Sequence, residues 1–149
     1  MRTLWTSGGG PVVGWINTKM FDETGDIAKS QGWTALILDT NGNGKRDEYV
    51  EPNQPVDPTK DKRIVAGFYA VMPSPVDGSV WGSFRSNPGA VVRLAPGSNP
   101  PETALAEIYN VPMPGFGRVA PTSIARASCG CRWRAVTWAA STGASAKAR

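Results

Sequence analysis

One short segment of this sequence combines side-chain types and a spacing that suit a metal ion. From Asp39 to Asp47 it reads Asp-Thr-Asn-Gly-Asn-Gly-Lys-Arg-Asp, which fits the first nine positions of a D-x-[DN]-x-[DN]-G calcium loop. A hard cation binds several oxygens at about 2.4 Å, and alternate residues of a tight turn can supply them. We therefore predict a calcium site whose ligands are the side chains of Asp39, Asn41, Asn43 and Asp47 and the main-chain carbonyl of Lys45.

The end of this loop departs from the pattern. Position 12, where a bidentate Glu is expected, is Val50. Glu48 or Glu51 could replace it only if the chain leaves the loop differently from a helix, and Lys45 and Arg46 reduce the local negative charge. We therefore expect weak, structural calcium binding, with a dissociation constant of about 10⁻⁴–10⁻³ M. The alternative interpretation is a plain Asn-Gly hairpin turn without an ion.

No residue pattern in the sequence stands out as a catalytic site. The sequence contains no His, and no serine elbow, phosphate-binding loop, HExxH motif or paired-carboxylate arrangement stands out. We assign no catalytic residue and do not expect this chain to be an enzyme by itself.

The rest of the chain up to residue 116 favours short strands. Gly and Pro contribute 17 and 13 of the 149 residues, which favours turns over long helices. One segment, Lys19–Gln31, could form a short helix or turn, interrupted at Gly25. The apolar, β-branched segments between turn signals predict an all-β, antiparallel fold; they are Leu4–Thr6, Val12–Asn17, Ala35–Leu38, Ile64–Val71, Val80–Phe84, Val91–Leu94 and Ala104–Val111.

An internal repeat leads to a family resemblance. Thr3–Ser7 and Ser79–Ser83 are both centred on a Trp, and Asp77–Gly117 resembles one blade of the streptogramin-lyase-like, NHL-like bacterial β-propellers. In that family D-G-x-[VL]-W opens one strand, as in Asp77–Trp81 here, and a second strand reads [IV]-x-R-[LI]-x-P, as in Val91–Pro96. The resemblance implies about two blades of an incomplete propeller in residues 1–116, with the calcium-type loop in an insertion at about 39–63.

The resemblance also implies a role and a location. We expect a truncated piece of a periplasmic or extracellular propeller that binds or scaffolds a small-molecule, glycan or protein ligand, although MRTLWTSGGG carries no signal-peptide pattern. One alternative is a fragment of a lyase-like propeller enzyme whose catalytic residues are missing here; the resemblance implies a His and a metal at the propeller centre, and this chain has no His. Another is a small calcium-stabilised β-sandwich interaction domain, favoured if the Trp5 and Trp81 strands share one core. Core packing is expected for these two Trp side chains, and the roles of Trp15 and Trp33 stay open.

The last 33 residues differ from the rest in charge. Residues 1–116 carry 10 Lys and Arg against 12 Asp and Glu, a net charge of −2, whereas residues 117–149 carry 6 Lys and Arg and no acid, a net charge of +6. We therefore expect no nucleic-acid partner despite the basic pI of about 9.3, and no membrane span. The composition predicts that 117–149 is a basic, low-order tail read from a shifted frame; a genuine disordered tail is the alternative. Cys129 and Cys131 are expected to be free thiols.

Overall fold

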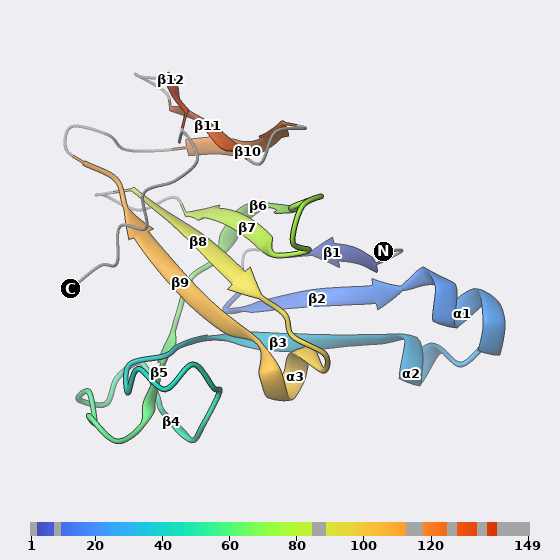
Figure 1. Ribbon diagram of the computed structural model, residues 1–149, viewed down its shortest axis with the longest axis horizontal. Helices are drawn as coiled ribbons and strands as arrows, with labels where there is room; N and C mark the ends of the chain where they lie inside the picture. The colour runs from blue at the N-terminus through green and yellow to red at the C-terminus, as the bar shows by residue number, and fades with distance from the viewer. Residues whose placement is uncertain are drawn as a thin grey trace.

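The structure is a computed structural model that describes residues 3–7, 10–84 and 89–112 in full, and the backbone of 118–124, 128–133 and 137–139. Strands dominate these residues, so the all-β prediction is confirmed (Figure 1). The helices are α1 (Thr18–Thr24), α2 (Ile27–Ser30) and α3 (Pro100–Thr103). The strands are β1 (Thr3–Thr6), β2 (Val12–Asn17), β3 (Gln31–Leu38), β4 (Tyr49–Val50), β5 (Asp61–Ile64), β6 (Phe68–Pro73), β7 (Val80–Phe84), β8 (Ala90–Ala95), β9 (Leu105–Asn110), β10 (Arg118–Ile124), β11 (Ser128–Trp133) and β12 (Thr137–Ala139).

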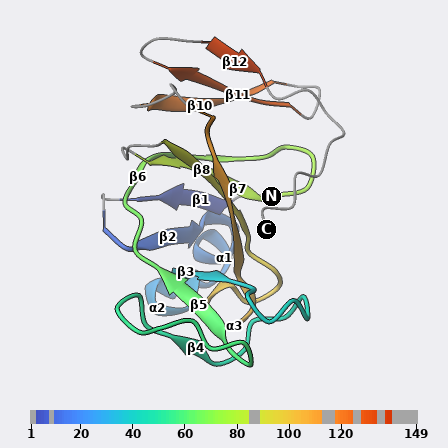
Figure 2. The same ribbon diagram turned by 90° about the vertical axis from the view of Figure 1, so that its left-hand side faces the viewer.

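The main sheet has the order β1-β2-β3-β9-β8-β7-β6, and β5 pairs with both β3 and β4. Its strands pair antiparallel except where β3 meets β9, at Leu38 and Ala106, and where β4 meets β5. The sheet curls until its two edge strands approach each other, so that β1 lies between β2 and β6 (Figure 2). The Ser7 hydroxyl donates a hydrogen bond to the carbonyl of Phe68 at 3.0 Å across this junction. The result is a nearly closed barrel.

Several sequence expectations match these elements, and one was wrong. The segments Val12–Asn17 and Val80–Phe84 form β2 and β7 with the expected bounds. The expected strand Ile64–Val71 is instead two strands, because the chain leaves β5 at Ile64 and enters β6 only at Phe68. The helical segment is short, as expected, since Gly25 ends α1 with a φ of +65°.

The main core lies inside the curled sheet and is centred on Phe68. Its ring stacks on Phe84, with the ring centroids 5.7 Å apart. Gly82 on the neighbouring strand β7 leaves room for the Phe68 ring, since a Cβ at this glycine would lie 2.5 Å from it. Val80 and Leu94 are fully buried in the same cluster.

The tryptophans whose side chains the structure describes divide between the two faces of the sheet. Trp5 packs against the main core, whereas Trp81 packs against Val91 and Tyr109 in a separate, smaller cluster. The β1 and β7 strands nevertheless share the main core, because Val80 of β7 belongs to it. Trp15 lies over Gly32, and Trp33 is 64% exposed.

The structure places three strands in the segment predicted to have low order. They form a separate antiparallel sheet, β10-β11-β12, and β10 lies against β6 and β7. The side chains of Cys129 and Cys131 lie outside the described part of the structure, and the shifted reading frame stays a prediction. Among the described residues, no helix is long and apolar enough to cross a membrane.

Candidate cation-binding site

The predicted calcium loop lies between the end of β3 and the short strand β4. Asp39 comes directly after β3, and its carboxylate organises the turn. Its Oδ1 accepts hydrogen bonds from the N–H groups of Gly42 at 2.6 Å and Asn43 at 3.2 Å, and its Oδ2 accepts one from Gly44 at 2.8 Å. Gly44 has a φ of +74°, a backbone conformation that side chains other than glycine rarely adopt. The sharp turn predicted at position 6 is therefore present.

Three of the predicted ligand side chains converge on one point. The amide nitrogens of Asn41 and Asn43 donate to Oδ2 of Asp47 at 3.1 and 2.5 Å. The side-chain hydrogen bonds from Asn43 and then Asn41 lower the pKa of Asp47 below its ordinary value. The positive charge of Lys45 adds to this lowering. This carboxylate is thus held in its charged form, as a cation ligand must be.

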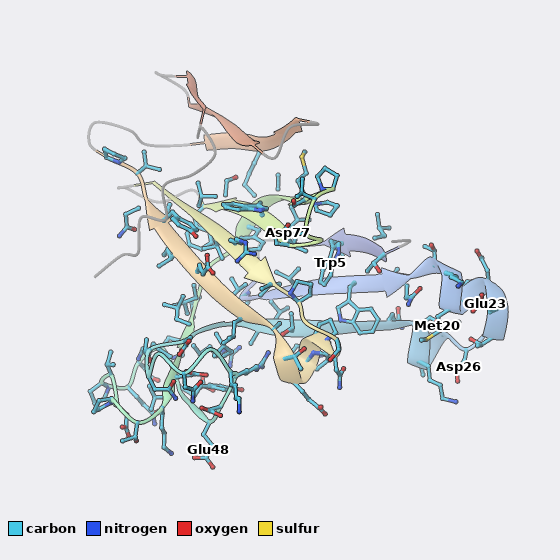
Figure 3. All side chains as sticks on the ribbon, in the orientation of Figure 1. Trp5, Met20, Glu23, Asp26, Glu48 and Asp77 are labelled. Atoms are coloured by element: carbon cyan, nitrogen blue, oxygen red, sulfur yellow. The ribbon has the colours of Figure 1, made fainter. Side chains whose placement is uncertain are left out.

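The chain leaves the loop as a strand. Val50, at position 12, lies in β4 and pairs with Lys62 of β5. Neither acid that could have replaced the position 12 Glu is available in this arrangement. Glu48 projects outward from the loop (Figure 3), is 83% exposed and pairs with Lys60 at 2.8 Å. Glu51 pairs with Arg63 at 3.1 Å.

Arg46, which the sequence suggested only as an unfavourable charge, anchors the loop to the sheet. Its Nη1 donates to the Thr34 hydroxyl at 2.8 Å and lies 3.4 Å from the carbonyls of Pro100 and Ala104. The guanidinium carbon lies 5.9 Å from the centroid of the Tyr49 ring. Partial burial lowers the pKa of Arg46, while Tyr49 and the nearby Asp61 oppose that lowering. No local pattern reveals this role, because the partners lie 12 to 58 residues away.

Acidic side chains alone do not make a metal centre here. In the part of the chain that the structure describes, no group of three or more His, Cys, Asp and Glu side chains could hold a metal ion. A cation in this loop would therefore depend on the amide oxygens of Asn41 and Asn43 and on main-chain carbonyls as well as on carboxylates.

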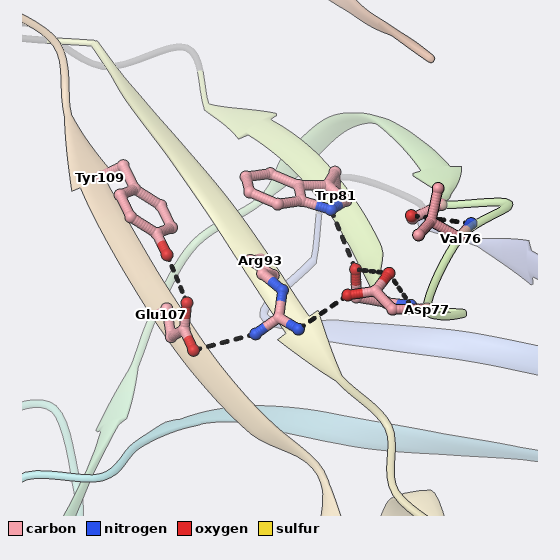
Figure 4. Close-up of polar contacts among 8 residues, drawn as sticks. Val76, Asp77, Trp81, Arg93, Glu107 and Tyr109 are labelled. Atoms are coloured by element: carbon pink, nitrogen blue, oxygen red, sulfur yellow. Dashed lines mark hydrogen bonds and ion pairs between the residues drawn. The ribbon is translucent and has the colours of Figure 1, made fainter. Parts of the chain in front are cut away.

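A second polar cluster covers the other face of the sheet, across β7, β8 and β9 (Figure 4). Arg93 bridges Asp77 and Glu107, with both N–O distances at 2.9 Å. The Tyr109 hydroxyl donates to Glu107, and its ring stacks on Trp81 with the centroids 5.8 Å apart. Burial and the Glu107 contact raise the pKa of Tyr109 to about 12. Trp81, which was expected to pack in the core, thus lies beside an ionic network.

This network predicts a dependence of stability on pH. Burial favours the neutral form of Asp77, but hydrogen bonds from Arg93, Ser79 and Ser74 outweigh it and lower the pKa well below the ordinary value of 3.8. The stabilisation is therefore present above about pH 4 and is lost as the pH falls toward the folded-state pKa. Thermal melts between pH 5 and pH 2 should show a shallower decline for Asp77→Asn than for the unaltered chain. Equal declines of the melting temperature would mean that Asp77 does not contribute to the pH dependence of stability.

The comparisons with known proteins give no relative: no family model, no curated protein and no solved structure matches this chain.

Proposed function

We propose that residues 39–47 bind a calcium ion that stabilises the long excursion between β3 and β5. The supporting observation is the convergence of Asn41, Asn43 and Asp47 on one point. An amide group has nearly the same shape at its oxygen and nitrogen ends. The nitrogens face the Asp47 carboxylate, while Oδ1 of Asn41 accepts the backbone N–H of Asn43 at 3.2 Å and Oδ1 of Asn43 accepts that of Lys45 at 2.8 Å. Rotation of the two amides would give up these two hydrogen bonds and present the oxygens to a cation. The proposal is thus supported by the oxygen-bearing side chains of this loop.

The loop supports a structural role for the ion. An ion held by Asp39 and Asp47 would join the end of β3 to the entry of β4, 11 residues further along the chain. A site with two neutral amides and two nearby basic residues binds weakly, in the range of extracellular calcium modules. We therefore propose that this chain is a calcium-stabilised β-domain with a binding or scaffold role in a periplasmic or extracellular protein.

A propeller origin is the second candidate. Its support is the antiparallel meander β6-β7-β8-β9, which has the up-and-down topology of a four-stranded propeller blade. The core shared by the β1 and β7 strands favours an independent β-domain instead. Size-exclusion chromatography and thermal melting separate the two. A monomer that unfolds cooperatively supports the domain, and an aggregating chain that melts without a transition supports a fragment of a larger propeller.

The calcium proposal predicts that calcium raises the melting temperature. At about 5 mM calcium and a dissociation constant of about 10⁻⁴–10⁻³ M, binding adds about 1–2 kcal/mol to the free energy of unfolding. This corresponds to a rise of several degrees. Asp39→Ala should abolish the rise, because it removes a ligand and the acceptor of three turn N–H groups.

A matched control lies in the same excursion. Asp57 is a half-buried acid outside the loop whose carboxylate accepts hydrogen bonds from Thr59, so Asp57→Ala should keep the full calcium effect. The proposal is wrong if several millimolar calcium leaves the melting temperature of the unaltered chain unchanged.

A further inference from the structure

A cluster of aromatic and charged side chains lies on the outer face of β7, β8 and β9 (Figure 4). Trp81, Arg93 and Glu107 stand side by side on these strands, since the register pairs Trp81 with Arg93 and Arg93 with Glu107. Tyr109 lies two residues further along β9, and Asp77 lies in the turn before β7. The alternate residues of these strands belong to the main core, so the side chains of the cluster on the strands point away from it. We call these five residues the outer cluster.

The two aromatic rings form a fixed apolar surface. The rings of Trp81 and Tyr109 are inclined by 21°, and both pack against Val91 of β8, which is 5% exposed. The indole Nε1 of Trp81 donates to the Ser79 hydroxyl at 3.0 Å, which fixes the orientation of the ring. Both aromatic side chains are only half-buried. The apolar surface is therefore held in place before a ligand arrives, and part of it faces solvent.

The polar side chains beside the rings are fixed as well. Arg93 pairs with Glu107 and Asp77, yet the three side chains remain 26%, 50% and 45% exposed, in that order. Oε1 of Glu107 accepts a hydrogen bond from Arg93, and Oε2 accepts one from the Tyr109 hydroxyl. A carboxylate oxygen has more than one lone pair, so Glu107 can accept further hydrogen bonds on its exposed side. A ligand that bonds to groups already held in place loses less affinity to the ordering of side chains.

The charge of the outer cluster limits which ligands it suits. One positive charge, on Arg93, lies between two negative charges, on Asp77 and Glu107, which leaves a net charge of −1. A nucleic acid needs free basic groups for its phosphates, whereas Arg93 is engaged on both sides, and a cation finds both acids already paired. The chemistry that fits is a neutral ligand with an apolar face and a rim of hydroxyl groups. A pyranose sugar ring has both, since its C–H groups form the face and its hydroxyl groups the rim.

We propose that the outer cluster binds a neutral saccharide. The C–H face of a sugar ring stacks on Trp81 and Tyr109, and its hydroxyl groups donate to Glu107 and accept from Arg93. The inference rests on the binding role proposed above and names its ligand class, and it does not depend on calcium.

Saturation-transfer NMR with neutral oligosaccharides tests this assignment. The probes are oligomers of glucose, mannose, galactose and N-acetylglucosamine at millimolar concentration. We expect one of them to bind the unaltered chain, and we expect Trp81→Ala to raise its dissociation constant by about tenfold or more, because aromatic side chains carry much of the affinity of a binding surface. Trp33→Ala is the matched control: Trp33 is 64% exposed and lies on β3, so its removal should leave the dissociation constant unchanged.

The outcomes separate this inference from the proposed calcium function. If no saccharide binds while calcium still raises the melting temperature, the calcium-stabilised domain stands and the saccharide inference is wrong. If a saccharide binds through Trp81 while calcium has no effect, the calcium proposal fails and this inference stands. If Trp33→Ala carries the loss, or if a DNA oligonucleotide binds and the saccharides do not, the assignment of the outer cluster is wrong.

A second measurement covers the case in which Trp81→Ala does not fold. Proton–nitrogen NMR of the unaltered chain follows the indole N–H of each Trp during a titration with the saccharide. The Trp81 resonance should shift, because its indole belongs to the outer cluster and is hydrogen-bonded beside it to Ser79, while the Trp33 resonance should not. A Trp81 resonance that stays fixed while a saccharide binds would overturn the assignment.

Discussion

Phe68→Ala is expected to lower the free energy of unfolding by about 3–5 kcal/mol, the usual cost of deleting a buried aromatic side chain. Phe68 is 2% exposed and belongs to the main core. Its ring stacks on Phe84 and fills the space over Gly82, and its carbonyl accepts the hydrogen bond from Ser7 that joins the two edges of the sheet. Loss of the ring therefore opens a cavity at the junction that closes the barrel. Urea unfolding followed by tryptophan fluorescence measures the loss.

Two further variants separate packing from a general sensitivity to substitution. Gly82→Ala should also destabilise the protein, by about 1–3 kcal/mol, because its methyl group would overlap the Phe68 ring. Phe21→Ala, at a side chain that is 44% exposed on α1, should cost much less. If Phe68→Ala costs no more than Phe21→Ala, the core described above is wrong.

Arg46→Met is expected to lower the free energy of unfolding by about 2–3 kcal/mol, because hydrogen bonds from a charged donor are stronger than neutral ones and Thr34 loses its charged partner. It should also weaken calcium binding, since Arg46 holds the loop against β3 and α3. Arg46→Lys should lose nearly as much stability as Arg46→Met, because an ammonium lacks the planar set of donors of a guanidinium.

The neighbouring residue provides the control for Arg46. Lys45 carries the same charge but its side chain is exposed, so Lys45→Met should change stability by less than about 0.5 kcal/mol. Chemical unfolding in calcium-free buffer measures the free energy of unfolding of both variants. Equal, small effects would show that Arg46 is another solvated charge and does not anchor the loop.

The sequence predicts the strands better than it predicts their arrangement. Alternation of apolar and polar residues and Gly or Asn turns are local signals, and they locate β2 and β7 without error. The pairing of β3 with β9 joins Leu38 to Ala106, and this depends on how the sheet curls. The repeat of Trp5 and Trp81 suggested equivalent positions, yet the two side chains lie in different clusters. Sheet closure is a non-local property that no short motif encodes.

The candidate site shows the same difference between local features, which the sequence predicts, and long-range contacts, which it does not. Spacing alone predicts Asp39, Asn41, Asn43 and Asp47 as candidate ligands, because a calcium loop is a continuous segment. Spacing could not reveal the anchoring role of Arg46, because the folded sheet is needed to bring Thr34 and the carbonyls of Pro100 and Ala104 beside it. In the sequence Arg46 stands out only as a charge that reduces the negative charge of the loop.

The most direct test of the central claim is a calcium titration followed by amide ¹H–¹⁵N NMR. The amides of Gly42 and Gly44 donate to the Asp39 carboxylate, so ion binding should shift their resonances, with a dissociation constant of about 10⁻⁴–10⁻³ M. The amides of Gly25 and Gly97, outside the loop, should not move. If the Gly42 and Gly44 resonances stay fixed up to about 10 mM calcium, well above the expected range, the loop is a plain turn and the calcium-binding function is contradicted.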